Sequence, residues 1–473
     1  MRLTSLIATL IALPMLAQAP QGSLDKLPDP RKMSAPKLQA PQPKVQSFSL
    51  ANGVRVLFIE DHELPVVEMY AAFKAGSLED PADKAGLAAM AANLLRTGGT
   101  KSFTSDQLNE KLENLAADVE FGASAENSGG GIHCFKADAA NVLTIFAEML
   151  RAPRFAADRI EFLRNQTLSR LKQQEDQPVQ LAVQGMRRLI FNGKGQGNPP
   201  TQATVKAITE QDLRTFASTW FVPNNMVLGL SGDLTLAEAK TLLKKTLGDW
   251  PKAKLPALAR TSEPTQAAPG IYVRKKDKVN QSVVLAGMIG YRDTDPDRVA
   301  LGAAFTVLGE GEMGSRLFNT IRTKNALAYQ AGSFSNFTNS VDGMFIGYAI
   351  TKGESTTKAA RLLREECIKL AKEGITSEEW ENAKRALTNK EVFANATSSA
   401  VIATAVGLAL FDQPLDTRAK RLEKLQTLDL AQVNEAVRRR FKPEDLRLYI
   451  LGDPAGFGED KPESLGKVTE VSK

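Results

Sequence analysis

The sequence has few of the residues that hold metals or cross-link small proteins. Its 473 residues include two histidines, His62 and His133, and two cysteines, Cys134 and Cys367. Cys-rich zinc fingers and Fe–S ferredoxins use three or four cysteine ligands per site, so two cysteines exclude both classes, together with multi-disulfide scaffolds. A catalytic zinc needs about three protein ligands, usually including two histidines. Because His62 and His133 lie 71 positions apart, no helical pair of the H-x-x-x-H type exists here. The cysteines are compatible with one disulfide or with two separate buried thiols.

Charge of one sign is not in strong excess either. A net charge of +6 over this length is too mild to indicate a nucleic-acid partner. The 43% hydrophobic and 24% charged content is typical of a folded chain, and the length predicts two or three domains of roughly 100–200 residues. No stretch beyond the N-terminus reaches 18 apolar residues, so we expect no stable membrane insertion.

The first 19 residues have the pattern of a signal peptide. Arg2 supplies the positive charge, residues 3–16 form a short apolar core, and Ala17-Gln18-Ala19 fits a small-x-small cleavage site. An uncleaved anchor is the alternative, although the apolar run is short for a bilayer. Residues 20–44 are rich in Pro, Gln and Lys and predict a flexible leader. We expect a secreted protein that resides in the periplasm.

An internal repeat decides the predicted architecture. Asp80-Pro81 followed by the sequence AGLAA at 85–89 returns as Asp295-Pro296 followed by ALGAA at 300–304, at an offset of 215. The pattern F-x-P followed by Gly-Asp, at 221–233, returns at 441–453 with an offset of 220. Two such echoes in the same order indicate two units that share one plan.

Each unit reads as strands, a helix, more strands, two long helices and a last strand. The expected strands are 54–59, 66–73, 119–125, 131–136 and 226–231 in the first unit, and 271–274, 281–288, 329–336, 343–350 and 446–451 in the second. Capping boxes at Thr104-x-x-Gln107 and Thr376-x-x-Glu379 predict helix starts. We therefore predict an α+β protein with two tandem homologous α/β sandwich domains, each a mostly antiparallel sheet with helices on one face. The domains span 45–250 and 271–455, with a linker at 251–270 and a loose tail at 456–473.

Two stretches carry a family resemblance. Residues 86–93 read GLAAMAAN, and residues 309–329 contain GEGEMGSRLF, then IR, then ALAY. These stretches, set in two tandem units, resemble the pitrilysin/insulinase zinc peptidases (family M16). The likeness is to the two-unit branch that includes mitochondrial processing peptidase, and it covers about residues 45–455.

In active members of that family, the first helix carries H-x-x-E-H, whose histidines bind zinc and whose Glu activates water, and a later Glu completes the site. By resemblance, Ala89 and Asn93 stand where the histidines would be, Ala92 replaces the catalytic Glu, and Arg170 replaces the distal Glu. Alanine cannot ligate a metal and arginine repels a dication. The resemblance therefore implies that this chain has no catalytic metal site and binds no cofactor of its own.

The second unit keeps the family pattern that the first has lost. The resemblance implies a glycine-rich loop at Gly309, Gly311 and Gly314, an Arg316 that holds a substrate carbonyl, and a Tyr329 that donates to the developing oxyanion. Residues 323–326 read TKNA, where the family usually has a Glu and a Gly. The alternative is a surface Arg316 that pairs with Glu312, and a Tyr329 in a strand core.

This asymmetric loss favours a non-catalytic, substrate-orienting subunit of a heteromeric zinc metallopeptidase. A homologous partner with H-x-x-E-H would supply the zinc and close over this chain as a clam-shell. Peptide substrates would add to a sheet edge through backbone hydrogen bonds. The alternatives are a structural core-type subunit and a peptide-binding protein without a peptidase role.

Overall fold

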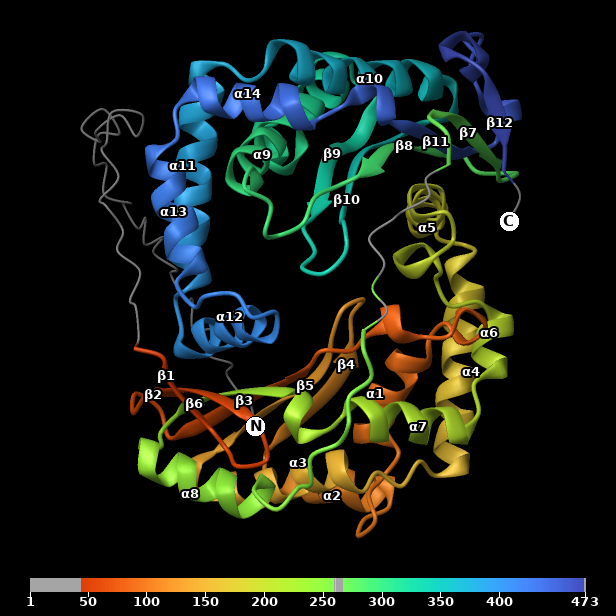
Figure 1. Ribbon diagram of the computed structural model, residues 1–473. Helices are drawn as coiled ribbons and strands as arrows, with labels where there is room; N and C mark the ends of the chain where they lie inside the picture. Colours follow the sequence, from red (N-terminus) through yellow and green to blue (C-terminus); the bar gives the residue numbers. More distant parts are fainter. Residues whose placement is uncertain (1–43, 259, 261–266, 472–473) are drawn as a thin grey trace, which may run out of the picture. The chain divides into compact units, whose positions relative to one another are not determined.

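Two six-stranded sheets organise the chain (Figure 1). The computed structural model describes residues 44–258, 260 and 267–471. The expected signal peptide and all but the last residue of the expected leader lie outside the described residues. In spatial order, the first sheet consists of β1 (Gln46–Ser49), β2 (Arg55–Glu60), β6 (Met226–Gly232), β3 (Val66–Phe73), β5 (Ser128–Phe135) and β4 (Asp118–Ala123). The second consists of β12 (Val468–Glu470), β7 (Gly270–Lys275), β11 (Arg447–Gly452), β8 (Gln281–Ile289), β10 (Met344–Lys352) and β9 (Ala328–Asn336).

The two sheets repeat one topology. The order β2-β6-β3-β5-β4 of the first sheet corresponds to β7-β11-β8-β10-β9 of the second. Strand β6 pairs in parallel with β2, and β7 pairs in parallel with β11 and β12, whereas all other neighbours are antiparallel. The predicted α+β class with mostly antiparallel sheets is thus confirmed.

The helices are distributed over both halves. The first half contains α1 (Leu87–Thr97), α2 (Ser105–Asn114), α3 (Ala139–Arg151), α4 (Ala157–Gln174), α5 (Pro178–Phe191), α6 (Gln202–Ala207), α7 (Glu210–Trp220) and α8 (Leu236–Leu247). The second contains α9 (Arg298–Phe305), α10 (Thr356–Glu373), α11 (Ser377–Ala394), α12 (Ser398–Leu410), α13 (Thr417–Thr427) and α14 (Leu430–Arg440). Both predicted capping boxes form, one at α2 and one at α11. Among the described residues, none of these helices combines the length and apolarity that crossing a membrane requires.

Each half has its own apolar core between its sheet and its helices. Cys134 lies in the core of the first half and Cys367 in that of the second, both with no solvent exposure. Both thiols are free. Of the two alternatives that the sequence left open, the structure has two separate buried thiols.

The halves also exchange one helix each across their sheets, which the expected layout with helices on one face did not anticipate. Helix α5 of the first half packs against β8 and β11 of the second sheet, and α12 packs against β6, β3 and β2 of the first (Figure 1). Glycine is required at both contacts. A Cβ at Gly185 would lie 2.3 Å from the Tyr449 hydroxyl, and one at Gly229 would lie 2.5 Å from Val406 Cγ2. Long-range packing therefore covers the second face of each sheet.

The C-terminal segment corrects one expectation. The residues after 455 were expected to form a loose tail, but β12 pairs in parallel with β7. The tail is anchored because Pro462 and Leu465 are buried, and the Leu465 carbonyl accepts a hydrogen bond from Arg364. A short strand with few apolar residues gives little sequence signal, since its stability comes from the sheet it joins.

Candidate functional site

Helix α1 carries three of the four positions where the resemblance implies lost metal-site residues. The helix begins after Gly86, whose φ of 106° is in the left-handed region that glycine favours. Asp80 caps this start, since its carboxylate accepts hydrogen bonds of 2.8 Å from the N–H groups of Gly86 and Ala88. Burial raises the pKa of Asp80 to about 6. Asp80 therefore fixes the first turn of α1.

None of the four positions can hold a divalent ion. Ala89 is exposed, Ala92 is fully buried, and the Asn93 amide oxygen accepts a hydrogen bond from the Thr97 hydroxyl at 3.0 Å. Arg170 is exposed on α4, which packs against α1. Across the described ranges, no group of three or more His, Cys, Asp or Glu residues could hold a metal ion. These residues do not fit the zinc of the family. The methyl groups of Ala89 and Ala92 and the guanidinium of Arg170 offer no lone pair to a metal, and the amide oxygen of Asn93 already accepts a hydrogen bond.

The glycine-rich loop of the second half follows a helix that changes its winding. Helix α9 continues into a π-helical segment, Thr306–Glu310, and the loop then passes through Gly311 and Gly314. A Cβ at Gly309 would lie 2.3 Å from the backbone nitrogen of Ser333 in β9, so only glycine fits there. Gly314, in contrast, has open space around it. Gly309 and Gly314 therefore differ: close packing against β9 requires a glycine at 309, whereas Gly314 lies in the exposed loop.

The structure holds Arg316 in a largely buried ion pair. Its Nε and Nη2 donate to the two carboxylate oxygens of Glu379 at 2.6 Å each, and Nη2 also donates to the Gly374 carbonyl at 2.9 Å. Glu379 also accepts the backbone N–H of Thr376 in the capping box of α11. The Arg316 side chain is 11% exposed. Arg316 thus ties the glycine-rich loop to the junction of α10 and α11 through Glu379 and Gly374.

Tyr329 lies apart from that pair, on the surface. It is 71% exposed near the start of β9, at a register shift in the β9–β10 ladder, and so is not a core tyrosine. Its ring centre lies 5.3 Å from the guanidinium carbon of Arg322, which lies 4.8 Å from the ring centre of Phe318. Arg322 is exposed and, within the described ranges, forms no ion pair. The structure therefore brings Tyr329 together with Arg322 and not with Arg316.

Arg322 is not among the site residues that the sequence pattern predicts. The signal was present, because Phe318 and Arg322 are four residues apart, a spacing that places side chains on one face of a helix. An arginine between two aromatic rings keeps its planar face on the rings and its N–H groups at the edge. Such a guanidinium is positioned in advance for a carbonyl or carboxylate oxygen.

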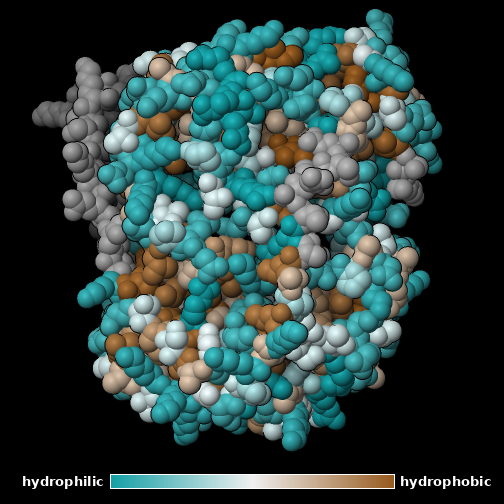
Figure 2. Space-filling model, viewed as in Figure 1, coloured by the Kyte–Doolittle hydropathy of each residue, from teal (hydrophilic) through white to brown (hydrophobic). Residues whose placement is uncertain are grey.

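A groove of about 560 Å³ lies between α12 and the strands β3, β4 and β5. Its strand side includes the glycines at 129–131, where the absence of side chains leaves backbone exposed, and its helix side includes Val406, Leu410 and Phe411. Strand β4 is the last strand of its sheet, so one row of its backbone groups has no strand partner. In Figure 2, brown apolar residues show in the region where Figure 1 places α12. The groove therefore combines a strand edge with an apolar wall.

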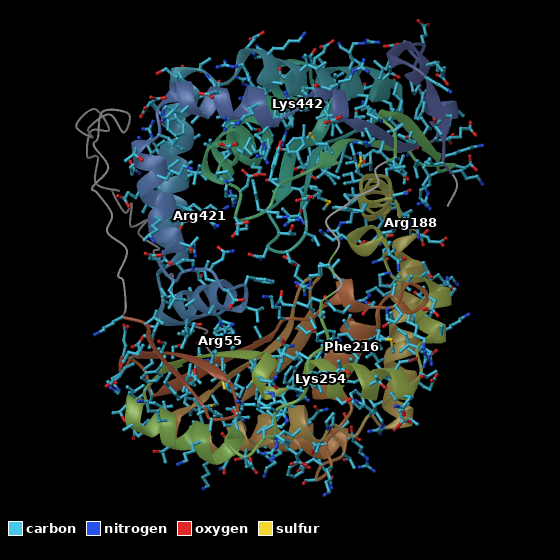
Figure 3. The ribbon with its side chains drawn as sticks, in the orientation of Figure 1. Arg55, Arg188, Phe216, Lys254, Arg421 and Lys442 are labelled. Atoms are coloured by element: carbon cyan, nitrogen blue, oxygen red, sulfur yellow. The ribbon has the colours of Figure 1, made fainter. Side chains whose placement is uncertain are left out.

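Polar contacts at both ends fix α12 on the first sheet. At its start, Ser398 donates to Asp61 at 2.5 Å and the Ser399 and Tyr70 hydroxyls lie 2.7 Å apart. Past its end, Asp412 pairs with Arg55 at 2.9 Å, the residue labelled beneath α12 in Figure 3. The hydrogen bond from Ser398 lowers the pKa of Asp61. Hydrogen bonds and an ion pair thus hold α12, the helix wall of the groove, in addition to its apolar packing.

Comparison with known proteins adds the family. Residues 55–203 match the family described as Insulinase (Peptidase family M16), and residues 207–387 match Peptidase M16 inactive domain. The Non-peptidase homolog YmxG of Helicobacter pylori is 26% identical over 418 residues, which cover 85% of this chain and 92% of that protein.

Two solved structures share the fold. The crystal structure of a peptidase M16 inactive domain from Pseudomonas fluorescens superposes with a TM-score of 0.79 at 26% identity, covering 87% of this chain and 98% of that one. The periplasmic protease PqqL from Escherichia coli gives a TM-score of 0.69 at 17% identity, covering 87% of this chain and 48% of that one.

Proposed function

Because the chain belongs to peptidase family M16 as a non-catalytic member, we propose that it is the substrate-orienting subunit of a heteromeric zinc metallopeptidase. In this proposal, a homologous subunit with H-x-x-E-H supplies zinc and the activated water. This chain supplies the groups that bind and orient the peptide. In this proposal, the chain alone is inactive, because Ala89, Ala92, Asn93 and Arg170 cannot together ligate a metal.

The observation that carries the proposal is the exposed cation between two aromatic rings. Arg322 contacts the rings of Phe318 and Tyr329, and it forms no ion pair in the described part of the chain. A peptide carbonyl that is attacked gains negative charge, and a fixed guanidinium and phenol stabilise that charge. Arg316, by contrast, already donates to Glu379 and Gly374. We therefore assign the substrate contacts to Tyr329 and Arg322, and a supporting role in the loop to Arg316.

The groove beside β4 supports the peptide as the substrate class. An extended segment can pair with the outer edge of β4, where the Val119 carbonyl already accepts a hydrogen bond from Arg96, because main-chain hydrogen bonds need no particular side chain. The glycines of β5 leave room near this edge, and the apolar residues of α12 provide contacts for side chains. Specificity by this route is broad, since backbone pairing reads the shape of the peptide more than its sequence.

The test is reconstitution of the full chain with a zinc-bearing homologue. Peptide hydrolysis should appear in the mixture only. Tyr329→Phe should lower kcat by about a hundredfold, in line with loss of one oxyanion donor. Arg322→Gln should also lower kcat, whereas Lys324→Gln, which alters an exposed cation two residues away, should leave it unchanged.

Three outcomes decide between the candidates. A mixture without hydrolysis, or one whose rate ignores both Tyr329 and Arg322, contradicts the proposal. Peptide binding without turnover beside the partner favours a peptide-binding protein. Co-purification with an integral-membrane complex in place of a peptidase favours a structural core-type subunit.

We further propose that the protein is exported to the periplasm. The N-terminal pattern of residues 1–19 supports export, and the PqqL protease of similar fold is periplasmic. Fractionation of the producing cells, with sequencing of the mature N-terminus, tests this: an intact Met1 in the cytoplasmic fraction contradicts it.

A further inference from the structure

A second pocket lies in the second half of the chain. It shares no lining residue with the groove beside β4, and Tyr329 does not line it. It has a volume of about 820 Å³, within the range of sites for small ligands. Its walls come from α10, the end of α14, the start of β7 and the C-terminal segment that ends in β12. The anchored tail described above closes one side of it, through the bond between Arg364 and the Leu465 carbonyl.

The pocket has an apolar floor and a basic rim. The floor combines nearly buried core side chains, among them Phe441 and Leu448, with apolar side chains that remain partly exposed, namely Tyr272, Ile368, Ala371 and Pro443. Five basic residues and one acid, Glu444, contribute to the lining; the basic residues are Arg364, Lys372, Arg438, Lys442 and Lys467. Figure 3 labels Lys442 just after α14. An excess of positive charge above an apolar surface favours a ligand that has a negatively charged head group and an apolar chain.

The cations of the rim are available for a ligand. Within the described ranges, Lys372, Arg438 and Lys467 form no ion pair, and Lys442 donates to the Arg438 carbonyl. The two arginines that follow Arg438 are engaged elsewhere, because Arg439 pairs with Asp297 and Arg440 with Asp295. The triple-arginine sequence is therefore divided: its last two members hold the fold, and Arg438 alone faces the pocket.

We propose that this pocket binds a single-chain anionic amphiphile, with its carboxylate at Arg438 and Lys442 and its acyl chain on the apolar floor. Lysine and arginine stems add apolar contacts while their charged ends meet the carboxylate. A peptide is less suited, because α10 and α14 satisfy their backbone groups internally, and the edge strand in the wall, β12, is only 3 residues long. A bilayer surface is less suited, because a concave pocket encloses one chain. This inference does not depend on the proposed peptidase role.

The test measures binding of hexadecanoate, below its micelle concentration, to the full chain by calorimetry. The matched probe is hexadecanol, which has the chain without the charge. The double variant Arg438→Gln/Lys442→Gln should weaken hexadecanoate binding by about tenfold or more, since two charge-assisted contacts are lost. Ala371→Trp fills the pocket and keeps every charge, and should also weaken binding. The control Lys244→Gln/Lys245→Gln alters two exposed cations of α8 and should have no effect.

Thermal unfolding of each variant separates lost binding from lost folding, and an unfolded variant is replaced by the single Lys442→Gln substitution. The proposal is supported if hexadecanoate binds more tightly than hexadecanol and both pocket variants weaken it. It is overturned if the wild type does not bind hexadecanoate, or if both folded variants bind as the wild type does. Binding to phosphatidylglycerol vesicles or to an acidic peptide without binding of hexadecanoate also overturns it.

Discussion

The ion pair between Arg316 and Glu379 gives the sharpest test of what Arg316 does. If its guanidinium orients substrate, its replacement changes turnover and leaves stability nearly unchanged. If it holds the loop to the α10–α11 junction, as its three hydrogen bonds indicate, its replacement lowers the free energy of unfolding. The perturbation is Arg316→Gln, alone and combined with Glu379→Gln.

The size of the effect follows from burial and geometry. A hydrogen bond to a charged group contributes about 1.5–3 kcal/mol, and removal of one partner from a buried pair costs more, because the other charge stays behind. Glu379 is 28% exposed, so water reaches it and softens that cost. We expect Arg316→Gln to lower the free energy of unfolding by about 2–4 kcal/mol, with a coupling energy between the two residues of about 2 kcal/mol.

The assay is urea unfolding followed through Trp380, which is 4% exposed and adjacent to Glu379. Of the three tryptophans of the chain, the other two are Trp220 and Trp250 in the first half. Trp220→Phe/Trp250→Phe therefore gives a background in which fluorescence reports the α10–α11 junction alone. A local probe is needed because a chain of this size need not unfold in one step.

The pH dependence supplies an independent check. Burial acts to raise the pKa of Glu379, but hydrogen bonds from Arg316 and Thr376 outweigh it and hold the pKa below its ordinary value of 4.5. A lowered pKa in the folded state stabilises the protein above the unfolded pKa, and that stability is lost as the pH falls through the folded pKa. The deficit of Glu379→Gln should be present at pH 7 and shrink below pH 4. A coupling energy under about 0.5 kcal/mol at pH 7 would refute the structural role of Arg316.

Three further predictions rest on other parts of the structure. Burial raises the pKa of Cys134 to about 11 and of Cys367 to about 12, so neither thiol of the folded protein should react with DTNB at pH 8. Both thiols should react after urea unfolds the protein, and rapid reaction of either thiol in the folded protein contradicts this prediction. Because the pKa of Asp80 is raised to about 6 in the folded state, the folded state holds its proton more tightly than the unfolded state. Stability should therefore fall by about 2.4 kcal/mol as the pH rises from 4 to 7, and Asp80→Asn should remove this slope in urea titrations. Gly229→Val should lower stability by about 1–3 kcal/mol because its side chain would meet Val406, whereas Gly407→Ala, with nothing within 4 Å, should be neutral or stabilising in thermal melts; equal effects would refute the helix exchange.

Local features of the chain were predictable from the residues that form them. The capping boxes at Thr104 and Thr376 formed as expected, because their hydrogen bonds join positions three residues apart. The strands 66–73 and 281–288 were found to within a residue by their Val and Ile content and turn residues. The repeat predicted two equivalent sheets for a related reason: similar sequences share local preferences and so share a plan.

Tertiary structure decided which side chains meet. Arg316 pairs with a residue 63 positions away, and Arg322 meets Tyr329 through a turn and a register shift, so spacing alone could not choose between the two arginines. Spacing also could not place α12. Its apolar residues indicate that the helix is buried, but they do not indicate which sheet it packs against.

By itself, the sequence determined which side chains stand at the four positions that resemble the zinc site of the family, since the identity of a side chain settles whether it has a lone pair to offer. Only the fold decided which residues face a ligand, because the energy of a charge or an apolar surface depends on neighbours that the chain brings together from far apart.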